Sequence, residues 1–144
     1  MSAAYEQPAG TAMLHDPAPS VVAVGLVAFA VIQLGLALFM AISPHAFYTD
    51  VGPFGAFNGH YIRDVASFYG AIGIALLLAV RRVSWRVPVQ ALTTIQYALH
   101  SVNHLLDIDK AHPAWTGYFD FLTLAGATVL LAWLWRAAAR EGTP

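Results

Sequence analysis

The stretch SVVAVGLVAFAVIQLGLALFMAI, residues 20–42, is apolar along nearly its whole length and contains no charged side chain. A bilayer core is about 30 Å thick and is crossed by about 20 residues of α-helix. Backbone groups in lipid must find hydrogen bonds within their own segment, which favours a helix over an open strand. Residues 1–19 hold no Lys or Arg, unlike the basic start of a cleaved signal peptide. We therefore expect a retained membrane-spanning helix with Ser20 as its N-cap.

Three further apolar stretches with few charges follow, at about 61–80, 87–106 and 116–135. The chain of 144 residues is 58% hydrophobic and 10% charged, whereas a soluble domain is about 25% charged. At that composition a soluble protein of this size lacks the polar side chains to cover its surface. The sequence therefore predicts an all-α fold, an integral membrane four-helix bundle with four transmembrane helices.

The same segments define the expected domain organisation. The length suffices for one domain, and we expect a single transmembrane domain over residues 20–137. Residues 1–19 are rich in Pro, Ala and Ser and lack apolar periodicity, which indicates a flexible tail. Residues 138–144 are expected to form a short cytoplasmic tail.

Basic residues are concentrated on one side of the predicted bundle. That side carries Arg81, Arg82, Arg86, Arg136 and Arg140. The opposite side carries only Arg63 and Lys110. The positive-inside rule then predicts a multi-pass protein of the plasma membrane with both termini in the cytoplasm. The net charge of −1 offers no basic surface for nucleic acid.

Polar side chains form a stripe along the 87–106 segment. Thr93, Gln96, His100, His104 and Asp107 follow one another at intervals of three, four, four and three residues. Residues at these spacings share one helix face. Because ionisable side chains that face lipid are costly, we expect this face to be turned to the bundle interior or to a partner.

A matching stripe opens the 61–80 segment, where His60, Asp64 and Ser67 share one face. This segment enters the membrane on the side where the 87–106 segment leaves it, so the two stripes are expected at equal depth. Asp120 can approach from the fourth segment. The sequence thus predicts a polar pocket near the outer membrane face. Its candidate ligand-binding residues are His60, Arg63, Asp64, His100, His104 and Asp107.

Several chemistries fit such a pocket. Histidines four residues apart with nearby carboxylates are typical ligands of zinc or non-haem iron, which makes His60, Asp64, His100 and His104 candidate metal ligands. Haem is less favoured, because His100 and His104 lie on one side and axial ligands must lie opposite one another. Without a metal, histidine beside a carboxylate can exchange protons with a quinone or a lipid head group. The chain has no cysteine, which excludes thiol chemistry.

A non-catalytic interpretation explains the same residues. Arg63 can neutralise Asp64 or Asp107 and so fix the helices together. The charges cost little in this position, because charged side chains near a helix end are readily solvated. The chain is then a structural or accessory subunit in the bilayer, within a homo-oligomer or beside a partner in a membrane complex. The sequence leaves open whether the protein is an enzyme.

The pattern also resembles a known group of membrane proteins. Asn58, His60, Arg63 and Asp64 lead into the second segment, and His100, His104 and Asp107 end the third. This arrangement, over residues 20–135, is similar to small actinobacterial-type four-helix membrane proteins akin to the DoxX-like superfamily. The resemblance implies four membrane helices and, for some relatives, a place in quinone-linked oxidoreductases. It implies no defined reaction.

Overall fold

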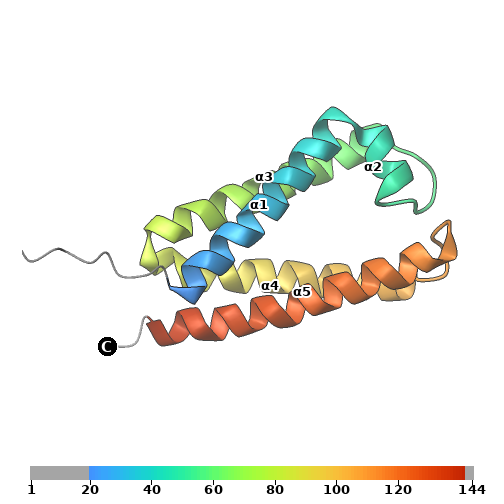
Figure 1. Ribbon diagram of the computed structural model, residues 1–144. Coiled ribbons are helices and arrows are strands. Elements are labelled where there is room, and N and C mark those ends of the chain that lie inside the picture. The colour runs from blue at the N-terminus through green and yellow to red at the C-terminus, as the bar shows by residue number, and fades with distance from the viewer. Residues whose placement is uncertain (1–19, 142–144) are drawn as a thin grey trace, which may run out of the picture.

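The computed structural model describes residues 20–141, which form five helices and no strand (Figure 1). The helices are α1 (Val21–Ile42), α2 (Pro44–Asp50), α3 (Gly59–Arg81), α4 (Val83–Leu106) and α5 (Ala114–Glu141). The prediction of an all-helical chain is confirmed over this range. The tails expected at 1–19 and beyond 141 lie outside the described residues.

The four long helices form two pairs. Helix α3 packs mainly against α1, and α4 packs mainly against α5, while α3 and α4 make a smaller contact. Figure 1 shows the pairs meeting at the end where α1 begins and α5 ends, and separating toward α2. We call these the joined end and the separated end. Helices α3 and α4 are thus direct neighbours, but each makes its larger contact with another helix.

Three helices, α1, α3 and α5, are long and apolar enough to cross a membrane. Helix α4 is equally long, at 24 residues, but it carries the polar stripe and is less apolar on average. The fourth transmembrane segment, and with it the four-helix membrane bundle, therefore stays a prediction.

The helix ends differ from the expected ones for local reasons. Ser20 caps α1 as predicted, since its hydroxyl accepts a hydrogen bond from the Ala23 amide at 3.2 Å. The expected segments 61–80 and 87–106 leave residues 81–86 between them, but only Arg82 separates α3 from α4. The short helix α2 was not predicted. Helix α5 continues to Glu141, so the tail expected from residue 138 begins inside a helix.

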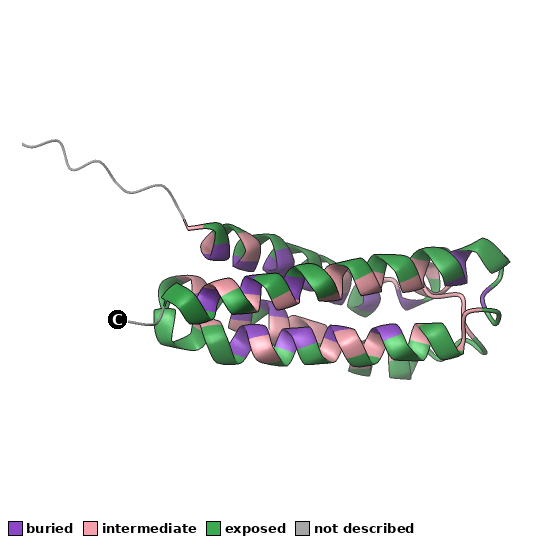
Figure 2. Cartoon of the chain, turned by 90° about the horizontal axis from the view of Figure 1, so that it is seen from below, coloured by how far each residue is buried: buried purple, intermediate pink, exposed green. Residues whose placement is uncertain are grey.

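The apolar core lies toward the joined end. Its buried residues come from the first half of α1, the last turns of α3, the first two-thirds of α4 and the end of α5, namely Val22, Leu26, Phe29, Ala30, Leu76, Ala79, Val89, Tyr97, Leu131, Leu134 and Ala138. Figure 2 shows buried positions on the inward sides of these helices. A Cβ at Gly25 would lie 2.6 Å from a Leu134 methyl carbon, so the glycine lets the Leu134 side chain pack closely against α1.

Arg86 connects all four long helices at the joined end. Its guanidinium forms a 2.5 Å salt bridge with Glu141 of α5 and reaches the Ser20 hydroxyl at 3.5 Å. It also donates to the last carbonyls of α3, to Ala79 at 3.4 Å and to Val80 at 3.3 Å. Those carbonyls have no partner within their own helix, so Arg86 allows α3 to end abruptly. We call this set of contacts the Arg86 junction.

Arg86→Gln is expected to lower the free energy of unfolding by about 2 kcal/mol, less than for a fully buried pair because Arg86 and Glu141 retain some exposure. The substitution leaves the Glu141 carboxylate without its partner. Thermal unfolding in mild detergent measures the change. The control is Arg81→Gln, which removes an exposed charge from the same end. Equal unfolding temperatures for Arg86→Gln and the parent chain would show that the junction does not hold the helices.

Candidate functional site

The separated half of the molecule contains a polar group built on α4 and α5. The imidazole rings of His100 and His104 lie one helical turn apart, with centroids separated by 4.7 Å and planes at 86°. His104 Nδ1 lies 4.0 Å from Asp120 Oδ2, and each of these side chains is only 15% exposed. A separation of 4.0 Å is too long for a hydrogen bond. The two groups therefore face each other without a direct hydrogen bond.

Three buried polar atoms in this region lack a hydrogen-bond partner. They are Gln96 Oε1, His104 Nδ1 and Asp120 Oδ2. Buried polar atoms in folded proteins are nearly always hydrogen-bonded, and an exception calls for an explanation such as a bound molecule. The arrangement thus offers one face of a binding site for a polar group.

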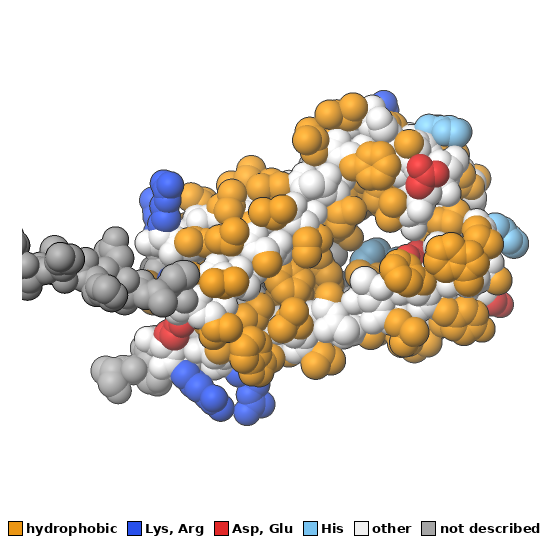
Figure 3. All heavy atoms as spheres, in the orientation of Figure 1, with side chains coloured by type: hydrophobic (Ala, Val, Ile, Leu, Met, Phe, Trp, Pro, Cys, Tyr) orange, Lys and Arg blue, Asp and Glu red, His pale blue; other side chains and the backbone are white. Residues whose placement is uncertain are grey.

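Other elements complete the surroundings of this group. The Phe54 ring, from the segment between α2 and α3, lies 4.9 Å from the His104 ring at 85°. The Phe54 backbone also pairs with Ala111, which joins the two connections at the separated end. Tyr69 approaches from α3 and interacts with the Gln96 side chain. Figure 3 shows the surface hollowed between the helix pairs, with histidine and acidic side chains in the hollow.

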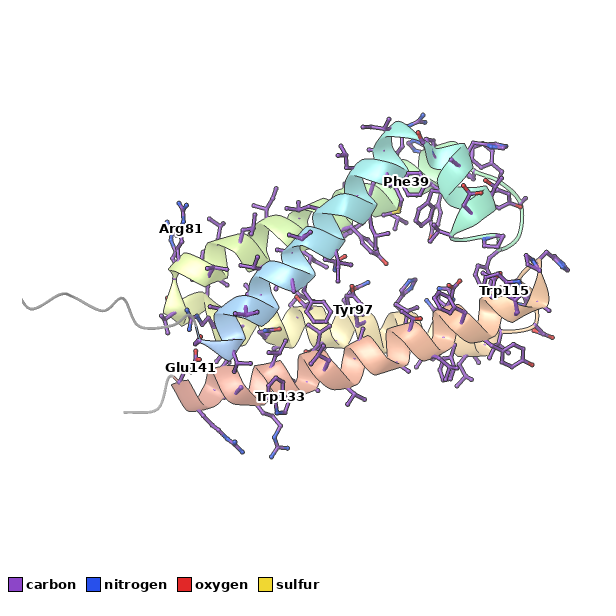
Figure 4. All side chains as sticks on the ribbon, in the orientation of Figure 1. Phe39, Arg81, Tyr97, Trp115, Trp133 and Glu141 are labelled. Carbon is purple, nitrogen blue, oxygen red and sulfur yellow. The ribbon has the colours of Figure 1, made fainter. Side chains whose placement is uncertain are left out.

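Two aromatic rings meet between α4 and α1. Tyr97 extends from α4 toward α1 (Figure 4), where its ring meets Phe29 edge-on at 5.9 Å. Both residues belong to the apolar core. They mark the position where the packed half of the molecule ends and the polar half begins, since His100 and His104 follow on the next two turns of α4.

A glycine fixes Asp120 opposite His104. Gly117, one turn before Asp120, lies so close to the end of α4 that a Cβ there would be 2.0 Å from the Ile108 carbonyl oxygen. Farther along the same pair, the hydroxyls of Ser101 and Thr128 lie 3.2 Å apart. The contacts hold α4 and α5 in one register, which sets the distance between His104 and Asp120.

The polar residues of α3 do not join this group. His60 and Asp64 pair with each other at 3.4 Å, and their side chains are 88% and 59% exposed. The buried side of α3 includes Ala66, which follows Asp64 by two residues and so lies on the opposite side of the helix. Packing of that side against α1 turns His60 and Asp64 outward.

Arg63 and Asp107 also have partners of their own. Arg63 donates to the Ala41 carbonyl of α1 at 3.4 Å, so it stabilises the end of that helix rather than a carboxylate. Asp107 accepts a 2.6 Å hydrogen bond from Lys110. This bond and the charge of Asp107 raise the pKa of Lys110.

The predicted pocket is therefore divided into separate groups. His100 and His104 lie together, as expected, with Asp120 and Gln96 nearby, while His60, Arg63, Asp64 and Asp107 lie elsewhere. Within residues 20–141, no three His, Asp or Glu side chains are placed to hold a metal ion. The four-ligand metal site of His60, Asp64, His100 and His104 is not assembled.

Two residues near the site were missed from the sequence. Tyr69 lies in an apolar run of α3, and only its hydroxyl could have indicated that it belongs to a polar site. Phe54 carries no signal, because its contact with His104 depends on the path of the connection after α2.

Comparisons with protein-family models, curated proteins and solved structures find no match to this chain, so the resemblance to the DoxX-like superfamily stays a prediction.

Gly117→Ala is expected to separate α5 from the end of α4 and to destabilise the fold by about 2 kcal/mol, as overpacking does. The matched control is Gly126→Ala, on the same helix, where no atom lies within 4 Å of the added Cβ. That change is expected to be neutral or slightly stabilising, since Ala favours a helix more than Gly. Unfolding in detergent compares the two, and a Gly117→Ala chain as stable as Gly126→Ala would contradict the close approach.

Proposed function

We propose that this chain is a four-span plasma-membrane protein that binds the polar head of a membrane-dissolved, quinone-type ligand between its two helix pairs. Helix α4 is the fourth span in this proposal. Judged by its own composition, α4 is not apolar enough to count as a membrane span, because of its polar stripe. The stripe, however, is turned toward α5 and the hollow, and polar side chains are tolerated in a membrane where they face the interior of a protein. The arginine-rich joined end then lies in the cytoplasm.

The observation that carries the proposal is the unpartnered pair of His104 Nδ1 and Asp120 Oδ2, 4.0 Å apart. An oxygen that both accepts and donates a hydrogen bond can bridge such a gap, receiving from an imidazole N–H and donating to a carboxylate. The hydroxyl oxygen of the reduced form, a quinol, fills both roles, whereas the carbonyl oxygen of the oxidised quinone only accepts. A phosphate head group fits less well, because its oxygens only accept and its charge is repelled by Asp120.

The surrounding residues support this ligand class. An amphiphile dissolved in the bilayer can enter the hollow between the helix pairs without crossing water. Phe54 covers one side of His104, and Tyr69 and Gln96 offer further polar contacts to the head. Ligand sites are commonly apolar cavities with a few convergent polar groups. In this arrangement His104 and Asp120 hold or release a proton at the bound oxygen.

The proposal is tested with decyl-ubiquinol, the reduced form of a short-chain quinone, and the purified chain in neutral detergent without oxygen. At a ligand concentration 100-fold above its dissociation constant, binding to the folded state adds about 2.7 kcal/mol of stability, which raises the unfolding temperature. His104→Ala and Asp120→Ala are expected to lose this increase, because each removes one side of the bridge. His60→Ala, a matched change at an exposed site, is expected to keep it.

Two results oppose the proposal. The parent chain showing no quinol-dependent stabilisation would favour the structural interpretation, in which the polar stripe only holds α4 against α5. If His60→Ala and His104→Ala lost the ligand-dependent stabilisation equally, the ligand would bind elsewhere on the chain.

A further inference from the structure

The interior of the molecule contains two buried carboxamides that no contact satisfies. Gln33 of α1 and Gln90 of α4 are both 0% exposed. Within residues 20–141, neither the amide nitrogen nor the amide oxygen of either side chain has a hydrogen-bond partner. Burying an amide without a hydrogen bond disfavours the folded state. Both side chains therefore require a polar partner, and bound water supplies it in most folded proteins.

The two amides lie on either side of the contact between Phe29 and Tyr97. Gln33 follows Phe29 by four residues, so it shares a face of α1 with that ring and lies one turn nearer the separated end. Gln90 precedes Tyr97 by seven residues, on the same face of α4 and two turns nearer the joined end. The rings meet edge-on at 5.9 Å (Figure 4). One amide thus lies toward the hollow and the other toward the Arg86 junction.

A line of polar side chains follows the inward face of α4 from the junction to the hollow. Its members occur every three or four residues, at Arg86, Gln90, Thr93, Tyr97, His100 and His104. Each of them is buried or half-buried, whereas the lipid-facing positions of the helix are exposed. Successive members are about 4.5–6 Å apart along the helix axis. A single water that forms two hydrogen bonds spans about 5.6 Å, so one water between neighbours makes the line continuous.

Side chains from the same region can bind such waters. The Thr93 hydroxyl donates its proton to the Val89 carbonyl at 2.8 Å, and its lone pairs remain able to accept from water. Tyr97 interacts with Tyr69 of α3, and Tyr69 interacts with the Gln96 side chain. The Gln96 amide oxygen is itself buried and without a partner. The polar line is therefore connected with the group around His104.

We propose that Gln33 and Gln90 bind internal water, and that this water and the polar side chains of α4 form a proton-transfer path between His104 and the joined end. Each water or hydroxyl on the path accepts one proton and passes on another. One proton released at one end therefore balances one taken up at the other. At the joined end the Glu141 carboxylate offsets the charge of Arg86, which would otherwise repel the proton.

The inference deepens the proposed function and rests on it for the source of the proton. A proton that His104 or Asp120 takes from the bound oxygen gains a route to the opposite side of the membrane. The path itself depends only on this chain, so it can be measured without a quinol.

The test uses liposomes that contain the purified full chain and enclose a pH-sensitive dye. A potassium gradient with valinomycin sets the membrane potential, and the dye measures proton entry. The parent chain is expected to admit protons faster than protein-free liposomes do. Gln33→Met and Gln90→Met are each expected to return the rate to that of protein-free liposomes, because Met keeps the length of the side chain and removes the amide. The control Ile95→Met, at a 51% exposed position of α4, is expected to keep the parent rate.

Radiolytic labelling in detergent detects the internal water separately from proton entry. Hydroxyl radicals formed from bound water oxidise the side chains next to it, and mass spectrometry locates the modified residue. Tyr97 is only 5% exposed, yet it is expected to be modified in the parent chain and less so in Gln33→Met and Gln90→Met. The parent chain alone decides the outcome where a Met variant does not fold.

Three results overturn the path. The first is proton entry in the parent chain that is no faster than in protein-free liposomes. The second is the parent rate in both Gln33→Met and Gln90→Met. The third is an unmodified Tyr97 in the parent chain, which shows a dry interior. A chain that admits protons through the amides but is not stabilised by decyl-ubiquinol would overturn the proposed function alone, and the reverse result would overturn the path alone.

Discussion

The architecture depends on the Arg86 junction. One guanidinium contacts the beginning of α1, the end of α3 and the end of α5 from its own position near the start of α4. Its side chain is only 13% exposed, and a charge in such a place is stable only where its donors are satisfied. The requirement brings four helix ends to one position. Arg86 also allows a connection of one residue, Arg82, between α3 and α4. Its guanidinium bonds the last carbonyls of α3, which would otherwise need water as their hydrogen-bond partner.

The joined end determines what the other half can do. Apolar packing is concentrated between the junction and the Phe29–Tyr97 contact, and the helix pairs separate beyond it. The α4 stripe continues into that separated half, where His104 and Asp120 face each other but do not bond. A uniformly packed bundle would bring a partner to these atoms or exclude them. The unpartnered atoms of His104 and Asp120 lie in the half of the molecule where the two helix pairs separate.

The sequence predicted the helices better than their relative orientation. Runs without charge mark α1 and α5 because lipid imposes length and composition on each helix separately, and Ser20 was recognisable as a cap by its local chemistry. Helical spacing placed His60 with Asp64 and His100 with His104, and both pairs exist. Spacing cannot say which way a face points. That depends on tertiary contacts such as Gly73 against Leu34, which turn the buried side of α3 to α1. Arg86 was interpreted only as a marker of the cytoplasmic side, because its partners are distant in sequence.

The two helix pairs meet at the Arg86 junction and separate toward α2. Pulsed electron resonance between spin labels measures this directly, since the chain has no native cysteine to interfere. One label pair at Val24 and Leu130 reports on α1 and α5 near the joined end, and another at Leu38 and Leu122 reports near the separated end; all four positions are exposed. We expect a short, narrow distance distribution for the first pair and a clearly longer one for the second. Equal distances at both ends would describe parallel, uniformly packed helices and would contradict it.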